Sequence, residues 1–592
     1  MTLGFVIGES KPTIVTAQTS RSLPIGEYVI INSKEGKIVG LVEKSVVSSA
    51  ALGDVNNYDE TLESIEVAAL NKRDKSHTAM IRILGFLESL QKGKAILPAV
   101  PPIPGTEIVK ATKDDLGQIF GPENKEWIKI GSLLRNPEID SLINLNKIVS
   151  RHLGILAMTG MGKSNLVTLL AKQIAKLDGT VIIFDYHNDY SGLDFPKMNV
   201  IDAKINPRLL EADTLADVLE IREGADVQQR VLRLAFTPEV KESANFWEAL
   251  DSQVRYIGAN PDRKEDRHSA DRVQDKIDDA RHRTSEILDP DMSNPVALIK
   301  EGRLNILNVS EFTDRQANVA LAYYLQELLA DRKAAVNAKG GKTKSKRNYR
   351  FNTPIFVIIE EAHVFIPKNE DAKAKYWVAK IAREGRKFGL GLGIVSQRPR
   401  DIEANVLSQM GSLAVMKIVQ EDDQRQIASA AESISREFIG QLTSLNIGDA
   451  ILVGQWVNLP AIVHIDEMKG KKIGSDQNAV GEWAVAKKIG DKTTFILPAV
   501  EGIIHVSILG PDNTIGIRIP THSFGPDLVA KIGYPITSSS VNRHGNKPLN
   551  NPTMIKQEFG TEIDLIIDAG ILPSSEGSTI YMLHNNRLKK IR

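Results

Sequence analysis

The residue types with the clearest chemistry lie in a short loop, Thr-Gly-Met-Gly-Lys-Ser, at positions 159–164. Small residues let such a loop wrap its backbone N–H groups around phosphates at the N-terminus of a helix. In that arrangement Lys163 reaches the β- and γ-phosphates, and Ser164 offers its hydroxyl to Mg²⁺. We therefore predict a nucleotide site made by Thr159, Gly160, Met161, Gly162, Lys163, Ser164 and Asn165.

The flanking segments have the patterns that such a loop requires. An apolar run ends at Ala157, residues 165–177 repeat apolar side chains at helical spacing, and residues 181–184 form a continuous apolar run. The last pattern is typical of a buried parallel strand. One departure is Ala157, which stands where the usual motif begins with Gly. A chance glycine-rich turn is the alternative, but it does not account for the strand–loop–helix–strand context.

Two adjacent carboxylates follow a second apolar run, residues 356–359. A buried parallel strand would deliver Glu360 and Glu361 to the edge of the sheet. Glu360 stands where Asp is more usual and would hold Mg²⁺ through water, whereas Glu361 would polarise the attacking water. Asp185, at the end of the strand after the loop, could support the metal or the water. Surface Glu pairs are common, so this interpretation depends on the upstream loop.

A glutamine and several arginines complete the requirements of nucleotide hydrolysis. Gln397 ends another apolar run and could sense the γ-phosphate by hydrogen bonding. Arg383, Arg386 and Lys387 lie just before that run, where an arginine can act on a neighbouring subunit's nucleotide. The alternative for them is an exposed, salt-bridged helix end. Arg151, just before the strand that leads into the loop, is a further candidate.

Three histidines lie near these positions in the sequence: His152, His187 and His363. No HExxH motif or paired ligand spacing accompanies them. We interpret them as packing residues or as polar support for the site, and not as metal ligands.

Residues 332–350 contain eight Lys or Arg residues and no acid. Such a segment can bind phosphate backbones and gain affinity by releasing counterions. A solubilising linker is an equally good interpretation. The candidate DNA-binding residues are Lys342, Lys344, Lys346 and Arg347.

Composition limits the class of protein. The chain has 592 residues, no cysteine, and 74 basic against 74 acidic residues. That length suggests roughly three or four domains. The lack of cysteine excludes disulfides, thiolate metal sites and a thiol nucleophile. Because no window of about 18 apolar residues and no signal-like N-terminus is present, we expect a soluble, cytoplasmic protein that spans no membrane.

The order of patterns along the chain predicts an α/β protein of several parts. Short strands separated by turns predict a β-barrel and linker over 1–145, with a Pro-rich linker at 97–106. Strand–helix alternation over 146–488 predicts a mostly parallel sheet covered by helices. Within it, 207–300 reads as an inserted helical subdomain. Residues 489–592 have a different character and form a C-terminal α/β extension.

At these motifs the chain resembles the HerA family of archaeal hexameric DNA translocases, in the FtsK–HerA branch of P-loop ATPases. The resemblance spans roughly residues 1–485. The matching stretches are LGFVIG, RHLGILAMTGMGKSN, IIFDYHNDY, FVIIEEAHVF, YWVAKIAREGRKFGLGLGIVSQRP with the following LSQM, and KIGSD…GEW.

This resemblance implies a RecA-like ATPase core, an N-terminal β-barrel of the HerA–ATP synthase type and an inserted helical bundle. It implies that Ala157 is tolerated, that Lys163 and Ser164 bind nucleotide and metal, and that Glu361 is the catalytic carboxylate. It further implies that Arg386 acts in trans and that Arg151 contributes a second arginine. The implied assembly is a six-membered ring around duplex DNA that uses ATP and Mg²⁺. Family members work with the nuclease NurA, and with Mre11–Rad50, in resecting DNA ends.

The stretches TTFILPA, TIGIRIPTH, YPITSSSVNRHGNKP, FGTEIDLIIDAG and GSTIYML resemble the C-terminal half of a YrdC-type threonylcarbamoyl-AMP synthase. The resemblance implies that Arg518, Ser540, Asn542 and Ser578 line a nucleotide and substrate cavity. The N-terminal half of that family, with its basic substrate-binding segment, is not evident upstream. We interpret the extension as a degenerate structural or partner-docking appendage, against residual nucleotide binding or threonylcarbamoyl transfer.

The sequence therefore favours a ring-shaped ATP-driven DNA translocase that functions in DNA end resection and double-strand-break repair. Two alternatives stay open: an enzyme of tRNA modification, suggested by the C-terminal resemblance, and a non-catalytic scaffold that assembles when nucleotide binds.

Overall fold

The computed structural model describes the chain in two compact units, Met1–Ile473 and Gly474–Arg592. The described residues are 2–591 apart from 72–73, 123, 223, 261–263, 284, 286, 293, 340–348, 432–434, 469–492, 500–504, 506–507, 519–523, 539, 544, 569, 572–578 and 585–586. No helix in this described part of the chain is long and apolar enough to cross a membrane.

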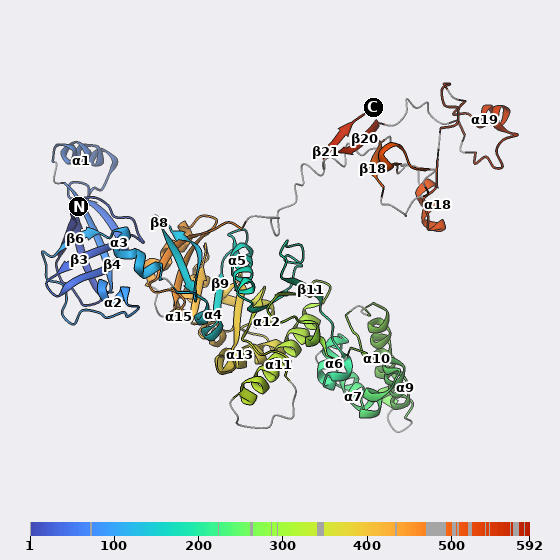
Figure 1. Cartoon of the computed structure of the whole chain (residues 1–592), viewed down its shortest axis with the longest axis horizontal. Helices are drawn as coiled ribbons and strands as arrows, with labels where there is room; N and C mark the ends of the chain where they lie inside the picture. Colours follow the sequence, from blue (N-terminus) through green and yellow to red (C-terminus); the bar gives the residue numbers. More distant parts are fainter. Residues whose placement is uncertain are drawn as a thin grey trace. The chain divides into compact units, whose positions relative to one another are not determined.

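Six strands of the first unit form a closed barrel in the order β1-β2-β5-β4-β3-β6 (Figure 1). Their bounds are β1 Thr2–Ile7, β2 Ile14–Thr19, β3 Tyr28–Ser33, β4 Gly36–Ser49, β5 Lys75–Phe86 and β6 Glu107–Lys110. Alternating side chains such as Val29, Ile31 and Ile81 fill the interior. The expected barrel is thus present. The helix α1 (Tyr58–Leu70), between β4 and β5, was not expected in this strand-rich region.

The segment after the barrel differs from the sequence prediction. The expected barrel rim or connecting arm up to residue 145 instead forms α3 (Lys113–Phe120), β7 (Trp127–Leu133) and β8 (Asn136–Asn144). β7 pairs with β17 (Ala461–Ile465), so β7 and β8 extend the central sheet. Sequence patterns miss this because the partner strand lies more than 300 residues later.

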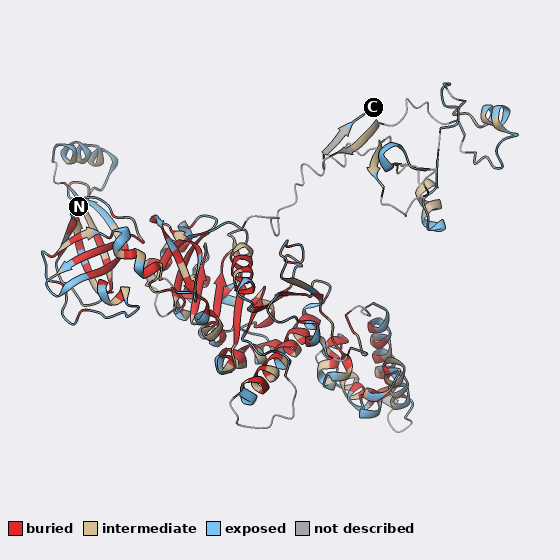
Figure 2. Ribbon diagram, in the orientation of Figure 1, coloured by how far each residue is buried: buried red, intermediate tan, exposed pale blue. Residues whose placement is uncertain are grey.

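The central sheet has eleven strands in the order β11-β12-β10-β13-β14-β9-β15-β16-β17-β7-β8. The first seven are mutually parallel, and the last four join antiparallel. Apart from β11 at the edge of the sheet, the parallel strands are buried along most of their length (Figure 2). The remaining bounds are β9 Leu153–Leu156, β10 Thr180–Asp185, β11 Met198–Asp202, β12 Leu304–Asn308, β13 Ile355–Ile359, β14 Leu390–Ser396, β15 Ser412–Val415 and β16 Asp449–Gly454.

Helices pack against this sheet and carry the connections between its strands. α5 contacts β10 and β12, whereas α11, α13 and α4 contact β14. Their bounds are α4 Leu145–Arg151, α5 Lys163–Lys176, α11 Asp314–Lys339, α12 Ala362–Phe365, α13 Lys373–Glu384, α14 Ala404–Leu407, α15 Glu421–Ala430 and α16 Arg436–Ile439. This is the mostly parallel sheet covered by helices that the alternation of patterns predicts.

The expected helical insert lies between β11 and β12 (Figure 1). Its helices are α6 Ala212–Val218, α7 Asp226–Ala235, α8 Pro238–Glu242, α9 Phe246–Gly258 and α10 Lys264–Arg283. Phe246, Leu250 and Val254 repeat at helical spacing on α9 and are buried, with Val273 and Ile277 of α10 in the same core. The helices therefore pack on each other, and their dense mixed charges lie on solvated faces.

The second unit is a small α/β segment with a four-stranded sheet in the order β19-β18-β20-β21. Its elements are β18 Thr493–Pro498, β19 Thr514–Ile517, α18 Phe524–Ile532, α19 Pro552–Phe559, β20 Thr579–His584 and β21 Arg587–Lys590. Among the described residues of this unit, none is buried.

Candidate nucleotide site

The glycine-rich loop joins β9 to α5 at the carboxyl end of the parallel strands. Gly160 and Gly162 have φ values of 78° and 105°, a left-handed backbone that favours glycine. Gly162 is the N-cap of α5, so the helix begins at Lys163. Ala157 is fully buried at the end of β9 and has no left-handed backbone, which explains why glycine is not needed there.

Lys163 is held at the loop. Its Nζ donates to the carbonyl oxygens of Ala157 at 3.1 Å and Met158 at 3.3 Å. Burial lowers the pKa of the Lys163 ammonium, while the nearby Glu361 and Glu360 raise it. The lysine therefore lies close to both carboxylates that the sequence singles out, although they come from a strand about 200 residues later.

Glu360 is buried at the end of β13 and meets a residue that the sequence did not reveal. The hydroxyl of Tyr190 donates to Glu360 Oε1. Burial, foremost, raises the pKa of Glu360 to about 7. Burial also raises the pKa of Tyr190 well above its usual value, and a hydrogen bond with Ser164 opposes that shift. Ser164 and Glu360 thus meet at one tyrosine hydroxyl.

Asp185 is buried at the end of β10. Its Oδ1 accepts from the backbone N–H of Asp189 at 3.0 Å, and its Oδ2 accepts from that of Tyr190 at 2.9 Å. The carboxylate therefore shapes the turn after β10 and places the Tyr190 ring against Glu360. Burial raises the pKa of Asp185, while these backbone donors lower it.

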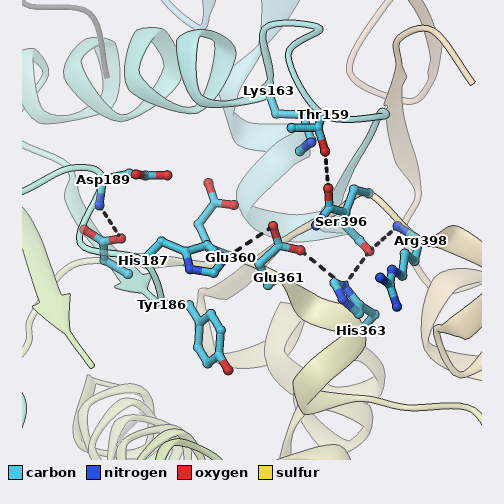
Figure 3. A network of polar contacts seen from close by, with 12 residues as sticks. Thr159, Lys163, Tyr186, His187, Asp189, Glu360, Glu361, His363, Ser396 and Arg398 are labelled. Atoms are coloured by element: carbon cyan, nitrogen blue, oxygen red, sulfur yellow. Dashed lines mark hydrogen bonds and ion pairs between the residues drawn. The ribbon is translucent and has the colours of Figure 1, made fainter. Parts of the chain in front are cut away.

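Glu361 turns away from its neighbour because its backbone is left-handed, with φ 45° and ψ 46°. Figure 3 shows its carboxylate between two histidines. His363 Nδ1 lies 3.3 Å from Oε2, and His187 Nε2 lies 3.9 Å from Oε1. His363 Nδ1 also lies 3.2 Å from the hydroxyl of Ser396, the last residue of β14. The two histidines are polar support for Glu361, in line with the sequence interpretation.

Gln397 follows β14 directly and reaches the glycine-rich loop. The Thr159 hydroxyl donates to Gln397 Oε1. The end of β14 therefore touches both halves of the site: Gln397 touches the loop, and Ser396 touches the support of Glu361. The sensing of the γ-phosphate by Gln397 stays a prediction.

Arg386 and Arg151 lie near the amino ends of β14 and β9, opposite the strand ends that meet the glycine-rich loop. Arg386 is exposed in the 3-10 turn Gly385–Phe388 that precedes β14, and Arg151 ends α4 just before β9. Because β14 runs for seven residues from that turn to the loop side, roughly 20 Å separates its ends. Neither arginine is therefore placed to contact phosphates held by its own chain's loop.

His152 forms hydrogen bonds to the elements on either side of Arg386. Its Nε2 is 3.0 Å from the Ala382 carbonyl oxygen, and its Nδ1 accepts from the Leu392 N–H at 3.0 Å. Burial lowers its pKa to about 4, so the ring is neutral. The ring links α4, α13 and β14, which confirms the interpretation of His152 as a packing residue.

The remaining predicted residues belong to the basic segment and to the second unit. Lys342, Lys344, Lys346, Arg347 and Ser578 lie outside the described residues. In the second unit, Arg518 and Ser540 are exposed, and Asn542 donates to the Asn546 carbonyl oxygen at 2.8 Å. Within the described chain, no cluster of three His, Asp or Glu side chains could hold a metal ion.

Comparison with known proteins identifies the family. The family described as "Helicase HerA, central domain" matches residues 128–328, which include the glycine-rich loop. The "DNA double-strand break repair helicase HerA" of Sulfolobus acidocaldarius is 35% identical over 503 residues, which cover 82% of this chain and 98% of that protein. This chain belongs to the HerA helicase family. The namesake from Pyrococcus furiosus is 33% identical and covers 79% of the chain and 93% of that protein.

HerA membership makes the chain a P-loop ATPase of the helicase class.

The second unit has other relatives. A family described as "Telomere recombination" matches residues 459–592. The "Threonylcarbamoyl-AMP synthase" of Idiomarina loihiensis is 27% identical over 95 residues, which cover 16% of this chain and half of that protein. Among solved structures, VirB4 of Thermoanaerobacter pseudethanolicus is 14% identical, with a TM-score of 0.42 over 59% of this chain and 98% of that one.

Proposed function

We propose that this HerA-family protein is an ATP-driven translocase on duplex DNA that assembles as a ring of six. The observation that carries the proposal is the placement of β14. One end of this strand reaches the glycine-rich loop through Gln397, and the other end presents the exposed Arg386. A site that can be completed only by an arginine from another copy needs an assembly of copies.

In the proposed site the loop residues 159–165 bind the triphosphate of ATP, with Lys163 close to the β- and γ-phosphates. Mg²⁺ prefers oxygen ligands and usually keeps several waters. The Ser164 hydroxyl and the Glu360 carboxylate fit that preference, because both meet at the Tyr190 hydroxyl. When bound there, the ion would neutralise charge on the phosphates.

Glu361 would orient and polarise the attacking water. Its carboxylate lies near Lys163, and its backbone directs it away from Glu360. Gln397 would report the γ-phosphate to β14. Arg386 and Arg151 of the adjoining copy would stabilise the negative charge that develops during phosphoryl transfer. Each hydrolysis event then changes the contact between two copies, which is the source of movement along DNA.

The relatives named above are DNA double-strand break repair helicases. On that basis we propose a role in DNA end resection, with a NurA-type nuclease and with Mre11–Rad50 as candidate partners. ATP and Mg²⁺ are the proposed cofactors.

The first test is ATP turnover with and without duplex DNA. We expect DNA to stimulate turnover in the wild type, and Lys163→Ala to lose at least about 100-fold because the charge on the β- and γ-phosphates is lost. The matched control is Lys176→Ala, at the exposed end of the same helix. Turnover that responds neither to DNA nor to Lys163→Ala would contradict the proposal.

A further inference from the structure

One oxygen of the proposed catalytic carboxylate lacks a hydrogen bond. Glu361 Oε2 is buried and accepts no hydrogen bond from any described residue. The ring of His363 lies beside this oxygen, with Nδ1 3.3 Å away. The other oxygen, Oε1, faces His187, whose side chain is 56% exposed. Oε2, on the buried side of the Glu361 carboxylate, is therefore the oxygen that lacks a hydrogen-bond donor.

The same His363 nitrogen has a second partner. It lies 3.2 Å from the Ser396 hydroxyl, with the geometry of a hydrogen bond. Ser396 is fully buried, and its Oγ accepts from the backbone N–H of Arg398 at 3.0 Å, so the hydroxyl is held in place (Figure 3). His363 Nδ1 is thus almost equidistant from the Ser396 hydroxyl, with which it forms a hydrogen bond, and from Glu361 Oε2, which has no hydrogen bond.

We propose that His363 is a positioning residue that holds Glu361 for water activation, with Ser396 as the alternative partner that releases it. This proposal rests on the proposed function, because it assigns Glu361 to the attacking water. A small rotation of the ring moves its N–H from the Ser396 hydroxyl to Glu361 Oε2. The carboxylate then has one fixed oxygen, and its Oε1 is left to accept a proton from water.

The electrostatics of the ring agree with this role. Burial, foremost, lowers the pKa of His363, although the Glu361 charge raises it. A neutral imidazole has one N–H and can donate to only one of the two partners at a time. Because Ser396 directly precedes Gln397, which touches the loop through Thr159, any change at the γ-phosphate end of β14 also reaches the partner of His363.

The test compares ATP turnover of His363→Ala, His363→Asn and wild type in the full-length protein. An orienting contact on a general base should affect kcat and spare binding. We expect His363→Ala to lose roughly 10- to 100-fold in kcat, with KM for ATP changed less than about twofold. His363→Asn keeps an amide N–H near the position of Nδ1. Its kcat should be about tenfold higher than that of His363→Ala.

A matched control removes another histidine–serine contact. His77 Nδ1 lies 3.0 Å from the Ser22 hydroxyl in the barrel, and His77→Ala should leave kcat unchanged. Ser396→Ala removes the alternative partner and should raise kcat. Three results would overturn the proposal: wild-type kcat in His363→Ala, a KM that rises in parallel with the fall in kcat, or an Asn variant no better than Ala. A wild type without DNA-stimulated turnover would instead contradict the proposed function.

Discussion

At the scale of single residues, the two adjacent glutamates show how one strand end can supply two different carboxylates. Glu360 is buried against Tyr190, and its pKa is about 7. Glu361 has a left-handed backbone that directs its side chain to His363 and His187. The two carboxylates therefore have different surroundings although the residues are adjacent. One carboxylate is suited to a cation, and the other to a water molecule.

The raised pKa of Glu360 predicts a pH-dependent stability. In the unfolded chain its pKa is near 4.5, and in the folded protein it is about 7. A raised carboxyl pKa stabilises the fold below the unfolded value, and that contribution is lost as pH rises through the folded value. Between about pH 4.5 and pH 7, the free energy of unfolding should fall by roughly 3 kcal/mol in the wild type relative to Glu360→Gln.

This prediction is checked by denaturant unfolding of the nucleotide-free protein at several pH values. The matched control is Glu370→Gln, which removes an exposed carboxylate in the loop after α12. A difference between wild type and Glu360→Gln that stays constant from pH 4.5 to 7 would show that burial does not raise this pKa.

At the scale of elements, His152 controls how α4, α13 and β14 meet. Its backbone has φ 64° and ψ 163°, a region that is almost restricted to glycine and costs about 1–3 kcal/mol. His152→Ala keeps this strain and loses two buried hydrogen bonds, so we expect a loss of roughly 2–4 kcal/mol in unfolding free energy. His152→Gly also loses the ring but relieves the strain.

We therefore expect His152→Gly to be more stable than His152→Ala by about 1–3 kcal/mol. Thermal or denaturant unfolding of the two variants checks this order. Because the ring links the helix ends that carry Arg151 and Arg386, both variants should also lose ATP turnover while they retain nucleotide affinity. Equal stability of the two variants would mean that the backbone at this position is not strained.

The sequence predicted the elements whose patterns are local. The apolar run before the glycine-rich loop, the helix after it and the strand before Glu360 are all readable from periodicity. The pairing of β7 with β17 was not predictable, because strand partners far apart in the chain leave no local pattern. The contacts of Tyr190 with Glu360, and of Ser396 with His363, were missed for the same reason. The support of the metal or the water by Asp185 stays a prediction, and the two backbone hydrogen bonds that its oxygens accept leave no local pattern in the sequence.

At the scale of the whole molecule, the positions of the loop and Arg386 at opposite edges of the sheet predict complementation between two inactive variants. Lys163→Ala lacks a working loop, and Arg386→Ala lacks the arginine. A mixed assembly contains sites with the loop of one variant and the arginine of the other. We expect ATP turnover to return to a substantial fraction of wild type on mixing, after each variant alone has lost at least about 100-fold.

Turnover of the mixture is measured after subunits have been allowed to exchange. Arg425→Ala is the matched control, because this arginine is exposed and pairs with Glu421 and Asp422 on α15. Mixing Lys163→Ala with Lys163→Ala carrying Arg425→Ala should restore nothing. A mixture of the two primary variants that stays inactive, or a protein that is monomeric with and without nucleotide, would rule out an arginine supplied in trans.

The exposure of the second unit bears on how its sequence can change in evolution. None of its described residues is buried, and its match covers half of the synthase it is similar to. Most large losses of stability come from cavities, overpacking or orphaned polar groups in a tightly packed interior. The described residues of the second unit form no such interior, so few of them are positions where a single substitution is damaging. These residues can diverge among close relatives much faster than those around the glycine-rich loop.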